Sequence, residues 1–299
     1  MDVSVKRVLM FAAIALALLP TGITTLTASA LLQMLHMPRT VRPDWPGAQI
    51  VQLESTDRLT LKAAWVESPS FQGSCVLSLH GAGGWRARSH RFLPWLLPAG
   101  YSVLAPDLRA QGESGGDTVT YGLLEQHDAL GWTSWMRAHG CVKIFGIGES
   151  LGASVLIMAA GQDPTAFQAV VAECPFADLL QAAEERARAF FHLPTPLAAL
   201  AVGGGNLYVR ATKDLNFAEA SPVQSVGKLK IPLLLIHGLA DTRTPPQHSR
   251  QLAAANPDHT DLWLVPGARH VGAYTKAPQE FERRVLRFFA ALQPIELNR

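Results

Sequence analysis

The chain contains the pattern Gly-x-Ser-x-Gly twice, and this pattern can hold a serine as a nucleophile. Ser150 lies in residues 148–152, directly after the apolar run 142–147 and directly before a helix-like segment. A sharp turn from strand to helix needs glycines beside the serine and lifts its hydroxyl above the sheet. Ser114 lies in residues 112–116, which follow no strand-like run, so we expect a loop there. The context therefore selects Ser150 as the candidate nucleophile.

A serine hydroxyl needs a general base to remove its proton. Of the ten histidines, His270 lies five residues beyond the last strand-like run, 262–265, and C-terminal to the serine. His237 also follows a strand-like run and stays open as an alternative base, although its His-Gly pair favours a turn. His80 lies in a similar turn, where a structural role is expected. The sequence thus predicts His270 as the base.

The acid that orients such a histidine comes between serine and histidine in the chain order of this motif. Asp241 lies five residues past the apolar run 231–236 and fits that place. Glu173 and Asp178 compete with it, but Glu173 ends a strand-like run and Asp178 is typical of a helix N-cap. We therefore expect Asp241 to orient the base.

An oxyanion hole needs backbone N–H donors that face the substrate oxygen. One donor is expected from Leu151, the residue after the nucleophile. The other is expected from the glycine-rich loop 80–84, which follows the strand-like run 75–79. Ala82 is the preferred donor of this loop, with Gly83 as its alternate, because glycines allow the backbone to approach a ligand closely.

The elements that must position these residues follow an alternating order along the chain. Two alternating runs, 49–55 and 59–67, predict a pair of strands. Six short apolar runs then alternate with helix-like segments, at 75–79, 101–105, 142–147, 169–173, 231–236 and 262–265. This order predicts an α/β fold with a mostly parallel central sheet and helices on both faces. Ligand sites in such sheets lie beyond the carboxyl ends of the strands, where the candidate residues fall.

The composition argues against nucleic-acid binding, and the spacing of the cysteines does not indicate a metal site. With a formal net charge of +2 and no basic stripe, the 299-residue chain does not read as a nucleic-acid binder. Three cysteines, Cys75, Cys141 and Cys174, are odd in number and lack metal spacing. We expect buried, reduced thiols and no disulfide framework. The chemistry proposed above requires neither a metal nor an organic cofactor.

The first 37 residues differ from the rest. Lys6 and Arg7 precede a stretch, 8–35, without any Asp, Glu, Lys or Arg. We favour a single transmembrane anchor, since about 20 apolar residues cross the hydrocarbon core of a bilayer. A signal peptide cleaved after residues 28–30 is the alternative, and a buried helix is a third possibility.

The domain limits follow from this segment. Residues 1–37 form the anchor or signal peptide, 38–48 a proline-rich connector, and 49–299 the folded domain. Basic residues before the apolar stretch favour a cytoplasmic N-terminus and an extracytoplasmic domain, although Arg39 and Arg42 beyond it weaken this orientation.

Five stretches of the chain, LHGAGG, PDLRAQGES, GIGESLG, HGLADTRTP and PGARH, resemble the α/β-hydrolase superfamily. The resemblance covers residues 49–292 and implies that Ser150, Asp241 and His270 are nucleophile, acid and base. PDLRAQGES departs from the family pattern at Ala110, where glycine is usual, in a loop that has a bracing role in the family. The N-terminal segment and small cap are also similar to the membrane-tethered Bem46-like group of serine hydrolases.

The resemblance also implies a cap over the active site, in residues 176–226 between two predicted strands. This insertion is longer than an ordinary connection and rich in Leu, Phe and Ala, which favours a substrate with a hydrophobic group. The expected activity is hydrolysis of carboxylic esters or thioesters through an acyl-enzyme. A serine peptidase for short peptides and a catalytically silent, membrane-tethered binding protein remain alternatives. Oligomeric state is left open.

Overall fold

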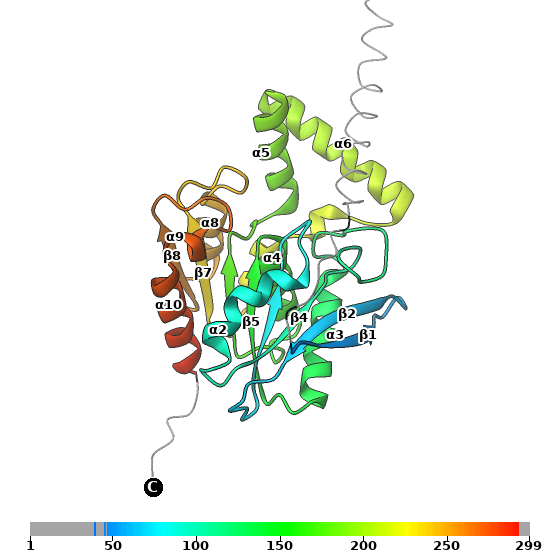
Figure 1. The fold of residues 1–299 in the computed structure, drawn as a ribbon. Coiled ribbons are helices and arrows are strands. Elements are labelled where there is room, and N and C mark those ends of the chain that lie inside the picture. The colour runs from blue at the N-terminus through cyan, green and yellow to red at the C-terminus, as the bar shows by residue number, and fades with distance from the viewer. Residues whose placement is uncertain (1–38, 40–44, 46, 293–299) are drawn as a thin grey trace, which may run out of the picture.

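The computed structural model describes residues 39, 45 and 47–292, and within them the chain forms one sheet in the order β1-β2-β4-β3-β5-β6-β7-β8 (Figure 1). The strands are β1 (Gln49–Glu54), β2 (Thr60–Val66), β3 (Ser74–Leu79), β4 (Ser102–Pro106), β5 (Lys143–Glu149), β6 (Ala169–Glu173), β7 (Leu233–Gly238) and β8 (Thr260–Val265). The β1–β2 and β2–β4 pairs are antiparallel, whereas all pairs from β4 to β8 are parallel.

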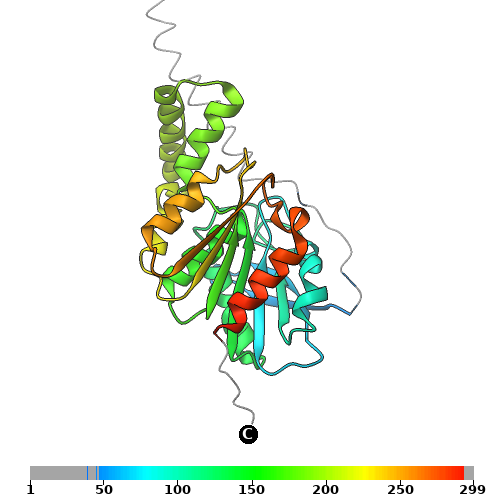
Figure 2. The ribbon, with the colours of Figure 1, turned by 90° about the vertical axis from the view of Figure 1, so that its left-hand side faces the viewer.

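Helices cover both faces of this sheet. They are η1 (Arg86–Phe92), α2 (Leu93–Leu96), α3 (Glu125–Ala138), α4 (Leu151–Gln162), α5 (Leu179–Phe191), α6 (Thr195–Lys213), η2 (Phe217–Glu219), α7 (Pro222–Val226), α8 (Gln247–Ala255), α9 (Ala273–Lys276) and α10 (Pro278–Ala290). One apolar core joins the sheet to α3, α4 and α8, and a second core joins it to η1, α2 and α10. Figure 2 shows α10, in red, lying along one face of the sheet. The predicted α/β-hydrolase architecture is confirmed.

The strands form where the apolar runs predict them, with shifts of a few residues at their ends. Central strands such as β3 and β7 are buried along their whole length because helices cover both of their faces. In β7, Leu233 and Leu235 face one core while Leu234 and Ile236 face the other. β1 pairs on one side only and is mostly exposed.

The segment between β6 and β7 holds α5, α6, η2 and α7. α5 and α6 run as a helical hairpin that stands away from the sheet above the carboxyl ends of its strands (Figure 1). Asp178 caps α5, as predicted, because its Oδ1 accepts a hydrogen bond of 3.1 Å from the Gln181 amide. His192 ends α5 in a left-handed conformation, which turns the chain into α6.

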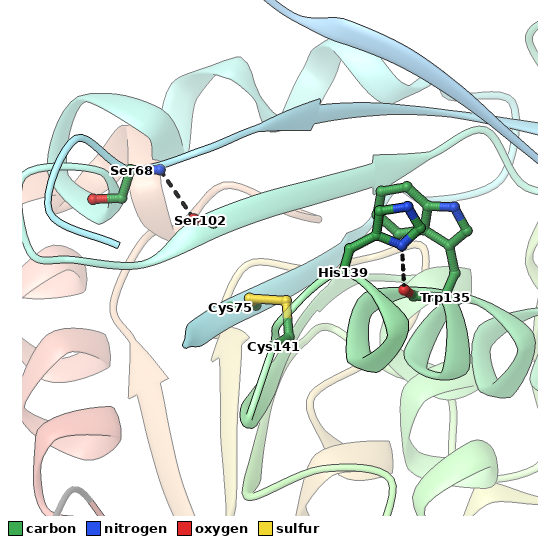
Figure 3. The surroundings of a disulfide bond; sticks show 6 residues. All are labelled: Ser68, Cys75, Ser102, Trp135, His139 and Cys141. Carbon is green, nitrogen blue, oxygen red and sulfur yellow. Dashed lines mark hydrogen bonds between the residues drawn. A yellow bond between two sulfur atoms is a disulfide. The ribbon is translucent and has the colours of Figure 1, made fainter. Parts of the chain in front are cut away.

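The expectation of three reduced cysteines is wrong, because Cys75 and Cys141 form a disulfide (Figure 3). The two residues are 66 positions apart in the chain, but their Cα atoms are 5.8 Å apart. Parallel pairing of β3 with β5 sets Cys75 beside Ile144 and so brings Cys141, two residues before β5, close to Cys75. An odd number of cysteines concealed this pairing, and only Cys174 is free among the described residues.

The predicted anchor or signal peptide, residues 1–37, lies outside the described residues, as does most of the connector 38–48. In the part of the chain that the structure describes, every helix is too short or too polar to cross a bilayer.

Candidate active site

Ser150 occupies the turn between β5 and α4 with φ 51° and ψ −113°, a conformation that non-glycine residues rarely adopt. The two motif glycines make this turn possible. A Cβ on Gly152 would lie 2.4 Å from the carbonyl oxygen of Leu79, and one on Gly148 would lie 2.6 Å from the amide of Ala153. The strained turn therefore presents the Ser150 side chain at the carboxyl edge of the sheet.

Three side chains from different loops meet at this edge. His270 follows β8, and its Nε2 lies 2.9 Å from Oγ of Ser150, 120 residues away in the chain. Asp241 follows β7, and its Oδ2 lies 2.7 Å from Nδ1 of the same imidazole. With the Nδ1 proton directed to the carboxylate, Nε2 is free to accept the serine proton. The structure thus brings the predicted nucleophile, base and acid into one hydrogen-bonded chain.

The surroundings of Asp241 keep it ionised. Its Oδ1 accepts hydrogen bonds from the amides of Arg243 and Thr244, at 2.9 and 3.0 Å. Burial opposes the charge, but hydrogen bonds from His237 and His270 outweigh it and hold the pKa of Asp241 well below its usual range. A carboxylate fixed from both sides can orient the imidazole of His270 through a protonation cycle.

The competing residues are engaged elsewhere. His237 Nε2 lies 2.8 Å from the carbonyl oxygen of Thr244, and its Nδ1 lies 2.7 Å from Ser249 Oγ, so this histidine braces the loop that carries Asp241. His80 Nε2 accepts the amide proton of Leu108 at 3.1 Å, and burial lowers the pKa of this imidazole. Glu173 accepts a hydrogen bond of 2.9 Å from the Ala273 amide.

Two amides are available to a substrate oxygen near Ser150. Leu151 is the first residue of α4, so its N–H has no acceptor within the helix. In the glycine loop, the Gly83 amide donates a 2.6 Å hydrogen bond to Gln111 Oε1 and is therefore occupied. The Ala82 amide has no such acceptor among the described residues. The structure thus favours Ala82 over its alternate Gly83 as the second donor.

A cavity of about 280 Å³ opens in front of Ser150 and His270. Its walls come from the glycine loop, the Ser150 turn, the start of the cap and the loops after β7 and β8. The lining residues are Gly81, Ala82, Gly83, Gly84, Arg88, Tyr121, Glu149, Ser150, Leu151, Phe176, Leu179, Ala182, Ala183, Arg186, Arg243, Thr244, His270 and Val271. The cap thus contributes directly to the space where a substrate would lie.

Arg91 contacts acidic residues next to Ser150, and this role was not predicted from the sequence. Its guanidinium donates to Glu149, the residue before Ser150, and lies 3.7 Å from Oε2 of Glu173. The carbonyl oxygen of Glu173 accepts the Ser150 amide proton at 2.8 Å. Glu149 and Glu173 pair across β5 and β6, so the partly buried Arg91, whose side chain is 22% exposed, lies close to the carboxylates at both strand ends. Two acidic residues at the ends of neighbouring strands were the signal in the sequence for such a cation.

One group of potential metal ligands lies at this site among the described residues. A ligand atom from each of Cys174, Asp241 and His270 falls within 4.8 Å of the others. Burial raises the pKa of the Cys174 thiol well above its usual range, which keeps the sulfur protonated and a poor ligand. Asp241 and His270 already bond to each other. These donors fit a catalytic chain better than a metal centre.

The second Gly-x-Ser-x-Gly segment is a loop, as predicted. Ser114 Oγ donates to the carbonyl oxygen of Asp107 at 2.7 Å and accepts the Lys62 amide proton at 2.9 Å. The same loop is braced by Arg109, which contacts Asp128 and Asp57 through charge-assisted hydrogen bonds. Ser114 is therefore a structural residue.

Known proteins share this architecture. The uncharacterized protein YqkD of Bacillus subtilis is 27% identical over 229 residues, covering 74% of this chain and 72% of the relative. The α/β-hydrolase domain-containing protein WAV2 of Arabidopsis thaliana is 25% identical over 237 residues, covering 73% of this chain and 74% of the relative. The Pyrococcus furiosus esterase PF2001 superposes with a TM-score of 0.70 at 26% identity, covering 87% of this chain and 98% of the esterase.

A family model matches the part of the chain that carries the site. Residues 89–293, which include Ser150, Asp241 and His270, match the model of the prolyl oligopeptidase family. The fold, the strand-end geometry and this match agree on a hydrolase of the α/β fold. The chain belongs to the prolyl oligopeptidase family, within the α/β-hydrolase superfamily.

Proposed function

We propose that the protein is a serine hydrolase that cleaves carboxylic esters or thioesters through an acyl-enzyme. One observation carries the proposal, the hydrogen-bonded chain from Ser150 Oγ through His270 to Asp241, with links of 2.9 and 2.7 Å. The cavity in front of Ser150 and the two amides of Leu151 and Ala82 provide room and donors for a carbonyl group.

The reaction has two halves. Ser150 Oγ bonds to the carbonyl carbon while its proton passes to His270 Nε2, and the carbonyl oxygen becomes an oxyanion that the Leu151 and Ala82 amides stabilise. The carbon–oxygen bond to the alcohol breaks as Nε2 returns the proton to the leaving oxygen. Water then attacks the acyl-enzyme, gives a proton to Nε2, and the carboxylic acid leaves as Ser150 regains its proton.

Labelling with a fluorophosphonate tests the nucleophile. Folded protein should be labelled at Ser150, and Ser150→Ala should abolish labelling and lower ester turnover on the order of 10⁴-fold or more. Ser114→Ala is the matched control, since it removes the serine of the other Gly-x-Ser-x-Gly segment and should leave labelling intact. Unlabelled folded protein would favour the catalytically silent binding protein instead.

Ester preference over amides is supported by the similarity to the esterase PF2001. A serine peptidase acting on short peptides is the second candidate, because the matching family model is that of prolyl oligopeptidases. Parallel assays with p-nitrophenyl esters and aminoacyl-naphthylamides separate the two. Faster turnover of the amides, with both activities lost in Ser150→Ala, would replace the esterase proposal by the peptidase.

A hydrophobic group on the substrate is supported by the apolar part of the cavity wall, Phe176, Leu179, Ala182 and Ala183. Three of these residues lie on α5, and Phe176 lies three positions before its first residue. p-Nitrophenyl esters from acetate to decanoate should show an optimum above acetate. A strong preference for acetate would refute the apolar subsite while leaving the esterase proposal standing.

The protein is further proposed to be held at a membrane by residues 1–37, with the hydrolase domain extracytoplasmic, or to be exported after cleavage. The uncharged stretch 8–35 supports this, and so does the Cys75–Cys141 disulfide, since disulfides persist in oxidising compartments. Carbonate extraction of membranes separates anchored from exported protein. Protease resistance of the domain in intact cells, with digestion only after lysis, would overturn the extracytoplasmic placement.

A further inference from the structure

Three arginines line the cavity in front of Ser150, Arg88 from η1, Arg186 from α5 and Arg243 from the loop after β7. Other arginines near the site are neutralised. Arg86 pairs with Asp107, Arg91 with Glu149, and Arg109 with Asp128. Among the described residues, the guanidinium groups of Arg186 and Arg243 have neither an ion pair nor a hydrogen bond. Two cations thus face the cavity without a counter-charge.

The charge balance of the cavity wall is positive. Glu149 is its one acidic residue among the described ones, and it is 4% exposed and already bound by Arg91, which does not line the cavity. Arg88 lies 3.7 Å from the other oxygen of the same carboxylate. A concave wall with unpaired cations concentrates anions, and guanidinium groups bind carboxylates and phosphates in a bidentate manner.

The cavity-lining residues of α5 follow one another along a single face of the helix. Leu179, Ala182, Ala183 and Arg186 are spaced by three, one and three residues, so they lie on one face of α5. At 1.5 Å per residue, Arg186 lies roughly 10 Å along the helix from Leu179. The hairpin extends away from the sheet (Figure 2), so the apolar residues come first and the cation comes further out.

We propose that Arg186 and Arg243 form a binding site for an anionic group of the substrate, a carboxylate or a phosphate. This inference rests on the proposed esterase function and names its substrate class. The substrate is an ester whose acyl part is apolar next to the carbonyl and carries a negative charge at its far end. The apolar part lies along Leu179, Ala182 and Ala183, and the anion lies between the cap helix and the loop after β7.

Matched esters test the site. Each p-nitrophenyl monoester of a dicarboxylic acid, from glutarate to suberate, is compared with the neutral alkanoate ester of equal chain length. The ratio of their kcat/KM values should favour the anionic ester by about 5- to 10-fold at low salt and fall towards 1 as ionic strength rises to 0.5 M, since salt screens exposed charges. Esters that end in a phosphate monoester distinguish phosphate from carboxylate as the preferred anion.

Substitutions assign the preference to residues. Arg186→Gln and Arg243→Gln should each lower the anionic-to-neutral ratio roughly threefold, and the double variant should bring it near 1. Arg186→Glu should reverse it in favour of an ester with a quaternary ammonium end. Arg188→Gln on the same helix and Arg250→Gln on α8 are matched controls, because both arginines are exposed and neither lines the cavity. Both controls should keep the wild-type ratio.

Three outcomes would overturn the inference. The first is a wild-type ratio at or below 1 while the neutral ester is turned over by Ser150, in which case the esterase proposal survives. The second is an equal loss of ratio in the control variants. The third is an equal slowing of both esters in the Arg186 and Arg243 variants, which would mean that the arginines act on the reaction itself. If no ester is hydrolysed and Ser150 is not labelled, the proposed function fails together with the inference.

Discussion

The carboxyl edge of the sheet, which holds the candidate active site, and the α5–α6 hairpin above it are built in opposite ways. At the edge, the acidic residues are buried and bonded, with Asp241 4%, Glu149 4% and Glu173 1% exposed. On the hairpin, large apolar side chains face solvent, with Phe190 79% and Leu207 67% exposed. At the edge the acidic side chains are held by hydrogen bonds and ion pairs, whereas on the hairpin large apolar side chains remain exposed to solvent.

The backbone shows the same contrast. Left-handed conformations of non-glycine residues gather in the loops beyond the strand ends, at Ala110, Tyr121, Ser150, Cys174 and Val271. On the hairpin they occur only after the last residues of α5 and α6, where they end helices. Strained backbone persists only where surrounding contacts enforce it. The comparison teaches that dense contacts hold the candidate site residues in place, whereas the hairpin above them keeps large apolar side chains exposed.

Asp241→Asn, at the edge of the sheet, should have the largest effect, which is a loss of ester turnover. An amide in place of the carboxylate donates a proton to His270 Nδ1 and stabilises the wrong tautomer, so kcat should fall on the order of 10⁴-fold. Ester turnover under saturating substrate measures this, with Asp178→Asn, the cap of α5, as a control that should retain most of the activity. A loss below tenfold would mean that Asp241 does not orient the base.

The same variant has a pH signature. Because the pKa of Asp241 is held below its usual range, its stabilising effect is present above the unfolded value of about 4 and is lost as the pH falls towards the native value. The difference in unfolding free energy between wild type and Asp241→Asn should therefore be a few kcal/mol near pH 7 and shrink below about pH 4. Urea unfolding at several pH values measures it, and a constant difference would contradict the assignment.

Arg91→Met should remove the ion pairs that stabilise Glu149 and Glu173 at the edge of the sheet. It leaves Glu149 and Glu173 buried without their shared cation, which should cost about 3–5 kcal/mol of unfolding free energy. Burial already raises the pKa of Glu173, so this variant should regain stability as the pH is lowered and the carboxyl groups take up protons. Arg88→Met is the control and should cost less than about 1 kcal/mol, since its side chain is 43% exposed. Equal losses in both variants would refute the special role of Arg91.

Two substitutions on α6 should sharpen the description of the hairpin. Val209 is fully buried and Leu200 is 63% exposed on the same helix. Val209→Ala should cost on the order of 2 kcal/mol, whereas Leu200→Ala should change stability by less than about 0.5 kcal/mol. Thermal unfolding of the two variants measures the difference. A large loss for Leu200→Ala would show that this surface is covered in solution.

The smallest expected effect comes from replacing alanine by glycine once in a loop at the edge of the sheet and once in the hairpin. Ala110 is held at φ 60°, so Ala110→Gly relieves strain of about 1–2 kcal/mol. The extra freedom of glycine in the unfolded chain costs roughly 0.5–1 kcal/mol, so the net gain in stability is at most about 1.5 kcal/mol. In the helical interior of α5, Ala187→Gly should instead cost about 1 kcal/mol. Melting temperatures should move in opposite directions. Destabilisation by Ala110→Gly would mean that the loop tolerates its left-handed alanine without strain.

Much of the fold and the order of the candidate site were accessible from the sequence. Six apolar runs marked the parallel strands, and residues three to five positions after three of them are the ones that meet at the edge. Both signals are local, since the pattern of a strand and the glycines of its turn lie within a few residues. The Cys75–Cys141 pair and the role of Arg91 are not local, because each depends on which strands are neighbours.

By itself, the sequence determined the positions of the strands, the tight turn at Ser150 and the chain order of the candidate nucleophile, acid and base, because local sterics and hydrophobic periodicity depend on consecutive residues. Only the tertiary structure decided which amide of the glycine loop is available, which cysteines pair and which cations face the cavity unpaired. These depend on distances of a few ångströms between segments far apart in the chain, and those distances are set by sheet register and packing.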